Sequence, residues 1–104
     1  MEGINYNKLV RDNIPEFLDN KGIPYEHRIL EEHEYVEELF KKLDEKTIEF
    51  LKAKTIEELA DVLQIIEEIK KLPEFKDVEN VRLSKLEEKG GFEKKYMVKG
   101  IDDR

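Results

Sequence analysis

Hydrophobic residues recur at three- and four-residue spacings through the middle of the chain. The first series is Val36, Leu39, Phe40, Leu43, Thr47, Phe50 and Leu51, and the second is Leu59, Val62, Leu63, Ile66 and Ile69. Such spacing puts each series on one face of an α-helix. The pattern therefore predicts two helices, the first over about residues 31–52, which pack antiparallel as a hairpin.

Local signals give the ends of these helices. Thr55 followed three residues later by Glu58 matches a capping box, so the second helix should begin at Ile56. Pro73 cannot continue a helix and should end it. The hairpin turn is then only a few residues long.

Two shorter helices are expected outside the hairpin. Asp12 or Asn13 can cap a helix with Pro15 in its first turn, and Gly22 should end it. A fourth helix, with Asp77 as its N-cap, should run through Glu88 and stop at Gly90-Gly91. Its apolar residues, expected to point inward, are Val78, Val81 and Leu86.

Alternating side chains mark two further segments. Residues 25–29 alternate Tyr25, His27 and Ile29, and residues 93–98 continue the alternation Phe92, Lys94, Tyr96 and Val98, which is compatible with a short pair of β-strands. The sequence thus predicts an all-α protein, a four-helix bundle around a central antiparallel hairpin, with that short strand pair added. At 104 residues we expect one domain spanning 1–104.

Composition excludes several classes of function. The net charge of −7 argues against a nucleic-acid polymer as the main partner. No cysteine is present, which excludes disulfides and thiolate zinc sites, and the two histidines, His27 and His33, are expected to be ordinary surface or interface residues. No apolar run approaches the length of a membrane span, so we expect a cytoplasmic protein without a membrane partner.

Four carboxylates flank the predicted hairpin turn. Glu45 and Glu49 lie near the end of the first helix, and Glu58 and Asp61 lie near the start of the second. Antiparallel packing would gather them, and oxygen ligands of this kind suit Mg²⁺, which is often shared with substrate phosphates. The alternative is that these residues only solvate the helix faces of an acidic chain.

A second group of charges lies near the N-terminus. Lys8, Arg11 and Asp12 are concentrated beside apolar Leu9 and Val10. The segment is either a surface cluster of ion pairs or an arm that binds phosphate. Composition alone favours the ion-pair cluster.

Three segments carry a resemblance to a known superfamily. The opening YNKLVRD of residues 6–12, followed by Ile14-Pro15, resembles the YNKLVRDxIP opening of one MazG-like branch. LDEKTIE of residues 43–49 with ELADVL of residues 58–63 resembles the EExxE and ExxD metal motifs, and KGGF of residues 89–92 resembles the closing (R/K)GGF. The chain therefore resembles the MazG-like and phosphoribosyl-ATP pyrophosphohydrolase-like all-α NTP pyrophosphatases.

The resemblance implies hydrolysis of a nucleoside triphosphate, or a related nucleotide, to the monophosphate and pyrophosphate. It implies Mg²⁺, with Mn²⁺ as a substitute, and assembly into a homodimer or homotetramer. The metal ligands would be Glu45, Glu49, Glu58 and Asp61, of which the last three match family metal positions directly. The cations expected to orient the phosphates are Lys8, Arg11, Lys85 and Lys89.

One residue departs from the family pattern. Lys46 stands where the second glutamate of EExxE is expected, and an ammonium group cannot coordinate Mg²⁺. Either Glu45 supplies the missing oxygen, or the site binds metal weakly, or Lys46 replaces one metal as a fixed charge for phosphate. The expected catalytic group is therefore Glu45, Lys46 and Glu49.

Two other functional classes stay open. One is a non-catalytic nucleotide-binding or oligomeric scaffold with a degenerate metal site. The other is a helical interaction module whose acidic cluster is only solvated.

Overall fold

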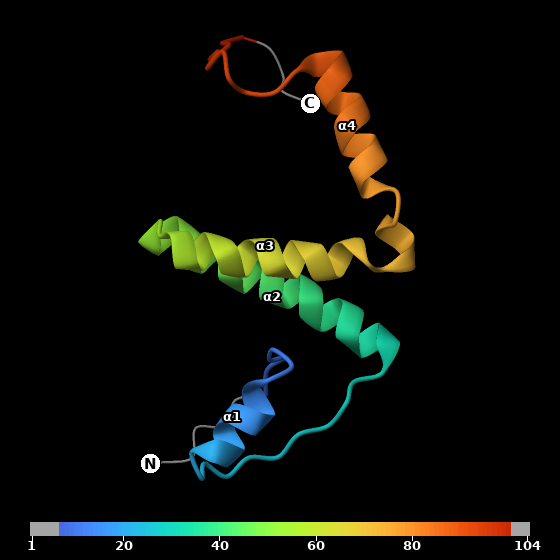
Figure 1. Ribbon diagram of the computed structural model, residues 1–104. Helices are drawn as coiled ribbons and strands as arrows, with labels where there is room; N and C mark the ends of the chain where they lie inside the picture. Colours follow the sequence, from blue (N-terminus) through green and yellow to red (C-terminus); the bar gives the residue numbers. More distant parts are fainter. Residues whose placement is uncertain (1–6, 101–104) are drawn as a thin grey trace.

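A computed structural model of the chain describes residues 7–100, and all described regular structure is helical (Figure 1). The helices are α1 (Ile14–Asn20), α2 (Glu32–Ala53), α3 (Ile56–Lys70) and α4 (Val78–Lys89), with a short 3-10 turn, η1 (Pro73–Phe75), between α3 and α4. The all-α prediction is confirmed. The first residue of the opening motif, Tyr6, lies outside the described residues.

The central hairpin is confirmed with boundaries close to those predicted. α2 and α3 run in opposite directions and pack along each other, and only Lys54 and Thr55 connect them (Figure 1). Lys54 adopts the left-handed conformation with φ of 54°, which ends α2, and its N–H bonds to the carbonyl of Phe50. The Thr55 hydroxyl accepts a hydrogen bond from the Glu58 N–H at 3.3 Å, which is one of the two bonds of the predicted capping box.

The core lies along the seam between α2 and α3. Leu39 on α2 and Leu72 after α3 are 2% and 4% exposed, and they are the only fully buried hydrophobic side chains of the described residues. Half-buried residues that extend the seam are Val36, Leu43, Phe50, Val62, Ile65 and Ile69. Phe75 of η1 closes one end by an edge-on ring contact with Phe40, with ring centroids 6.2 Å apart.

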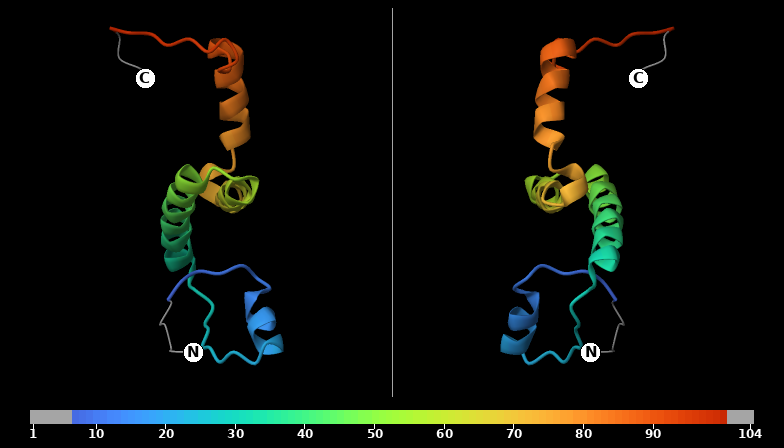
Figure 2. Two further views of the ribbon diagram at one scale, coloured as in Figure 1. Left: turned by 90° about the vertical axis from the view of Figure 1, so that its left-hand side faces the viewer. Right: turned by 90° about the vertical axis from the view of Figure 1, so that its right-hand side faces the viewer.

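α1 and α4 lie on opposite sides of this hairpin (Figures 1 and 2). The radius of gyration is 18.4 Å, whereas a compact domain of this length has about 13 Å. The chain exposes 9963 Å², whereas about 6,100 Å² is expected for a compact monomer of this mass. Much apolar surface on the outer helices is therefore left uncovered within one chain.

Two sequence predictions fail. Residues 25–29 and 93–98 form no strand in the described structure, because they lie at opposite ends of the molecule and cannot pair (Figure 1). Val78, Val81 and Leu86 of α4 do not point into a core of their own chain but are 40% or more exposed. Among residues 7–100, no other helix packs along α4 to cover these side chains.

Candidate functional site

The four carboxylates are distributed around the turn end of the hairpin. Glu45 and Glu49 lie in the last three turns of α2, and Glu58 and Asp61 lie in the first two turns of α3. The tight connection at residues 54–55 makes these helix ends neighbours. Their backbone positions follow directly from the two helix boundaries.

Most of these carboxylates form ion pairs with cations of the same chain. The Arg11 guanidinium donates to Asp61 Oδ1 at 2.7 Å, and the Lys8 ammonium lies 3.5 Å from Glu45 Oε1. The N-terminal segment is thus bound to both helices of the hairpin. The structure therefore shows the ion pairs that were one of the two alternatives for this segment. The carboxylates in these pairs, Asp61 and Glu45, are also two of the predicted metal ligands.

Lys46 bridges the two helices from within the cluster. Its ammonium lies 3.0 Å from Glu49 Oε2 on its own helix and 3.9 Å from Asp61 Oδ2 on α3. The hydrogen bond to Glu49 raises the pKa of Lys46, although partial burial opposes that shift. Lys46 is therefore a permanent positive charge between two of the expected metal ligands.

Lys42 is a member of the cluster that the sequence reasoning missed. Its ammonium lies 3.7 Å from Glu45 Oε1, and its side chain is only 17% exposed. Burial raises the pKa of Glu45, but Lys42 and Lys8 outweigh burial, so the pKa of Glu45 ends below its ordinary value. The i, i+3 spacing of Lys42 and Glu45 on one helix could have predicted this ion pair from the sequence.

Glu58 differs from the other three carboxylates. Its Oε2 atom is buried and has no hydrogen-bond partner. An unpaired buried carboxylate oxygen costs free energy, which makes it a place where a cation or donor would bind favourably. Across residues 7–100, however, no three acidic or histidine side chains converge into a ready-made metal shell.

Lys85 and Lys89 lie away from this cluster within one chain. They lie on α4, which begins beyond the opposite end of α3 from the hairpin turn (Figure 1). Ion pairs therefore link six of the predicted site residues in two sets. Lys8 pairs with Glu45, and Asp61 pairs with both Arg11 and Lys46, which also pairs with Glu49. Glu58 lies one helical turn from Asp61.

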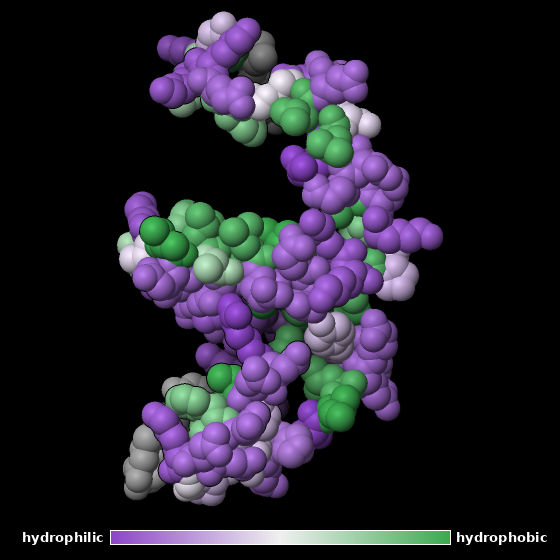
Figure 3. Space-filling view, viewed as in Figure 1, coloured by the Kyte–Doolittle hydropathy of each residue, from purple (hydrophilic) through white to green (hydrophobic). Residues whose placement is uncertain are grey.

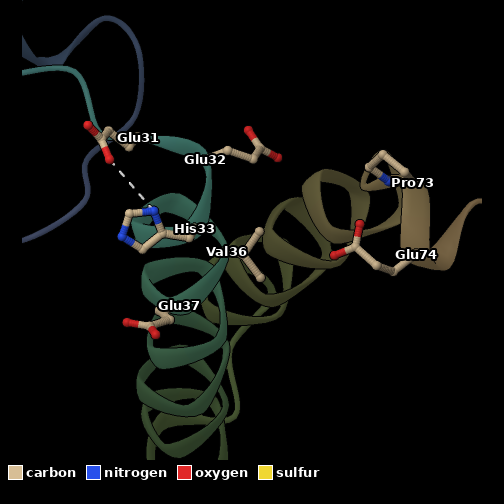
Figure 4. A pocket seen from close by; sticks show the side chains of 7 residues that line it. All are labelled: Glu31, Glu32, His33, Val36, Glu37, Pro73 and Glu74. Atoms are coloured by element: carbon tan, nitrogen blue, oxygen red, sulfur yellow. Dashed lines mark ion pairs between the residues drawn. The ribbon is translucent and has the colours of Figure 1, made fainter.

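A hollow of the described surface lies elsewhere on the molecule. It measures about 730 Å³ and lies between the start of α2 and η1, lined by Glu31, Glu32, His33, Val36, Glu37, Pro73 and Glu74 (Figure 4). His33 Nδ1 lies 3.7 Å from Glu31 Oε2 there. Four glutamates line the hollow, so it would repel the phosphates of a nucleotide.

Comparisons of the chain with protein-family models, with characterised proteins and with solved structures give no match. The MazG-like resemblance stays a prediction that depends on the three sequence segments. No described helix is both long enough and apolar enough to cross a membrane.

Proposed function

We propose that the protein is a Mg²⁺-dependent nucleotide pyrophosphohydrolase that cleaves an NTP, dNTP or related nucleotide to the monophosphate and pyrophosphate. The observation that carries the proposal is the meeting of Arg11 and Lys8 with Asp61 and Glu45 at the hairpin turn. A site for a metal-bound triphosphate needs carboxylates and phosphate-binding cations at one place. The opening motif and the two metal motifs of the resemblance contain these same residues.

The residues fit one hard cation, although not a complete protein shell. Mg²⁺ is commonly held by one or two carboxylates, with water and substrate phosphates as the other ligands. Glu58, with its unpaired buried oxygen, and Asp61 would hold the ion, and Glu49 of α2 shares the Lys46 ammonium with Asp61. The chemistry that such an ion supplies when bound is charge neutralisation at the phosphates and activation of water.

The cations of the chain have a separate task. Arg11 is exposed and offers a planar fork of N–H donors, which matches a phosphate in a bidentate manner. When a nucleotide binds, Arg11 and Lys8 exchange a carboxylate partner for phosphate oxygens, so the carboxylates are released for the cation. Lys46 stays between Glu49 and Asp61 and orients the phosphates as a fixed charge, which positions the bond to be broken.

A second candidate function is a non-catalytic nucleotide-binding scaffold. The observation that favours it is the bridging position of Lys46, which pairs with Glu49 and Asp61 and repels a divalent cation. In that case nucleotide would bind through Arg11 and Lys8 without cleavage. The two candidates differ in whether pyrophosphate is released.

The test is pyrophosphate release across a panel of NTPs and dNTPs with Mg²⁺ or Mn²⁺. We expect activity in the wild type and its loss in Glu58→Gln, which removes the charge at the unpaired oxygen. The matched control is Glu67→Gln, on the same helix and exposed, which should retain activity. Nucleotide binding without release in the wild type would select the scaffold, and neither binding nor release would refute both candidates.

A further inference from the structure

Two exposed apolar stripes of the same chain border one open space. The stripe on α3 is between 38% and 85% exposed and consists of Ile56, Leu59, Leu63 and Ile66. The stripe on α4 is between 40% and 48% exposed and consists of Val78, Val81 and Leu86. Figure 3 shows apolar surface along α3 and on the side of α4 that overhangs it. Apolar side chains are thus exposed on both sides of the same space.

α4 is held at its first turn. An ion pair between Glu79 and Lys70, at 3.4 Å, ties this turn to α3, and the other end of α4 extends away (Figures 1 and 2). A helix of twelve residues is marginally stable by itself in water. Residues 76–77 link η1 to α4, and a few residues at the end of an element are sufficient for a hinge.

The lengths of the two helices and of their connection allow α4 to fold back over α3. Seven residues, 71–77, connect the two helices, and connections of about two to eight residues join antiparallel neighbours in helical bundles. α4 is about 18 Å long and α3 about 22 Å. A folded-back α4 would therefore cover the α3 stripe nearly to the hairpin turn.

The ion pair between Lys70 and Glu79 gives the register of this packing. Seven positions back along α3 and seven forward along α4 from that pair, Leu63 comes opposite Leu86. Ten positions from the pair, Ala60 comes opposite Lys89. The antiparallel arrangement thus brings one apolar stripe onto the other.

Charges on the two helices are complementary in the same register. α3 carries five carboxylates and one lysine, and Glu67 lies beside its stripe, one turn after Leu63. Three positions from the ion pair, Glu67 comes opposite Arg82. Two α3 helices packed on each other would instead bring like charges together. The short connection also keeps α4 at an effective concentration of about millimolar beside its own α3, so α4 of the same chain is the occupant that fits.

We propose that α4 is a hinged lid, which folds back about residues 76–77 and packs antiparallel on the α3 stripe of its own chain. The chain then exchanges between the open arrangement of Figure 1 and a closed arrangement in which both stripes are buried. Closure places the end of α4 beside the first turns of α3, which carry Glu58 and Asp61. Closure itself is independent of the proposed function, whereas control of access to those carboxylates rests on it.

The first experiment uses two introduced thiols, because the chain has no cysteine. In Ala60→Cys/Lys89→Cys the thiols meet only in the closed arrangement, since the end of α4 otherwise extends away from α3 (Figure 1). The matched control is Ala60→Cys/Glu87→Cys, whose second thiol lies about half a turn away, on the outer face of α4. The effective concentration of each pair is measured against glutathione at low protein concentration.

We expect the pair at positions 60 and 89 to have an effective concentration at least about tenfold above that of the control pair. Equal values for the two pairs would overturn the proposal. A disulfide that doubles the molar mass would overturn it as well, because α4 would then cover another copy of the chain.

The second experiment tests whether the α3 stripe receives α4. Leu63→Glu and Gln64→Glu are each added to the pair at positions 60 and 89. Both add one negative charge to α3, but position 63 lies in the stripe, whereas Gln64 is an exposed residue bonded to Glu68. Leu63→Glu should lower the effective concentration at least about tenfold because closure would bury its charge. Equal effects of the two substitutions would refute the packing of α4 on this stripe.

If the thiol variants lose their helical circular dichroism signal, hydrogen exchange of the wild type decides instead. A closed α4 should protect the amides of residues 82–89 at least about 100-fold relative to an unfolded chain. An α4 without a partner surface is only marginally helical, so its amides should exchange nearly as fast as those of an unfolded chain. The latter result would overturn the proposal.

Control of access is tested with Mn²⁺ and a non-hydrolysable triphosphate analogue added to the pair at positions 60 and 89. Occupation of a site beneath the lid should change the effective concentration of the thiols at least about threefold, since the ligand then biases the open and closed arrangements differently. An unchanged value with bound analogue would refute this control. If the analogue does not bind at all, the proposed function fails, while the measurement without ligand still decides whether α4 closes.

Discussion

Replacing Lys46 by glutamine removes the positive charge from the centre of the carboxylate cluster and keeps a side chain of similar size. The ammonium lies 3.0 Å from Glu49 Oε2 and 3.9 Å from Asp61 Oδ2. Since its pKa is raised, principally by the hydrogen bond to Glu49, it is charged throughout the neutral range. Any divalent cation held by those carboxylates is repelled by it.

The size of this repulsion follows from Coulomb's law. A divalent ion bound to the two carboxylates would lie about 5 Å from the ammonium, which costs about 1.7 kcal/mol at the dielectric constant of water and more in a partly buried site. The Lys46 side chain is only 24% exposed, so this figure is a lower bound. Lys46→Gln should therefore bind Mn²⁺ at least about 15-fold more tightly than the wild type.

Isothermal titration calorimetry with Mn²⁺ measures this change directly. The matched control is Lys41→Gln, which removes an ion pair to Glu38 of similar length, 3.1 Å, from the exposed side of the same helix. Its Mn²⁺ affinity should stay that of the wild type. Equal affinities for Lys46→Gln and Lys41→Gln would refute the placement of the metal beside Lys46.

Two other predictions concern stability and pH. Leu39→Ala should lose about 3 kcal/mol of unfolding free energy because it opens a cavity in the seam, whereas Leu51→Ala, at a side chain 57% exposed, should lose far less in the same thermal melts. The Arg28 guanidinium lowers the pKa of Glu34 to about 2. That pair stabilises the fold above the ordinary carboxyl pKa, and the stabilisation is lost as pH falls toward 2. Arg28→Ala should raise the pKa of Glu34 toward 4.5 in an NMR titration, and a value unchanged at about 2 would contradict this.

Local sequence was sufficient for the helices. The periodic apolar residues of α2 and α3 and the Thr55 cap depend on contacts within a few positions, so their boundaries were predicted nearly to the residue. Gly90 ends α4 with φ of 80°, a conformation that suits glycine. The same reasoning failed for residues 25–29 and 93–98, because a strand needs a neighbour and alternation does not show whether one is near.

The carboxylate cluster was predicted only in part. Helix spacing and a short turn were enough to bring α2 and α3 ends together, so the grouping of Glu45, Glu49, Glu58 and Asp61 near one end followed from sequence. The cation that pairs with each carboxylate could not be predicted from the sequence. Arg11 and Asp61 are fifty positions apart, and they meet only because of the path that the N-terminal segment takes.

The sequence by itself determined the helices, the tight turn and the residue types available at the hairpin end, since each depends on short-range periodicity and capping. Only the tertiary structure decided that Lys46 lies between Glu49 and Asp61, that one oxygen of Glu58 is buried without a partner, and that α4 lies away from the hairpin turn. These features depend on long-range packing, which positions side chains by contacts between segments that no local pattern records.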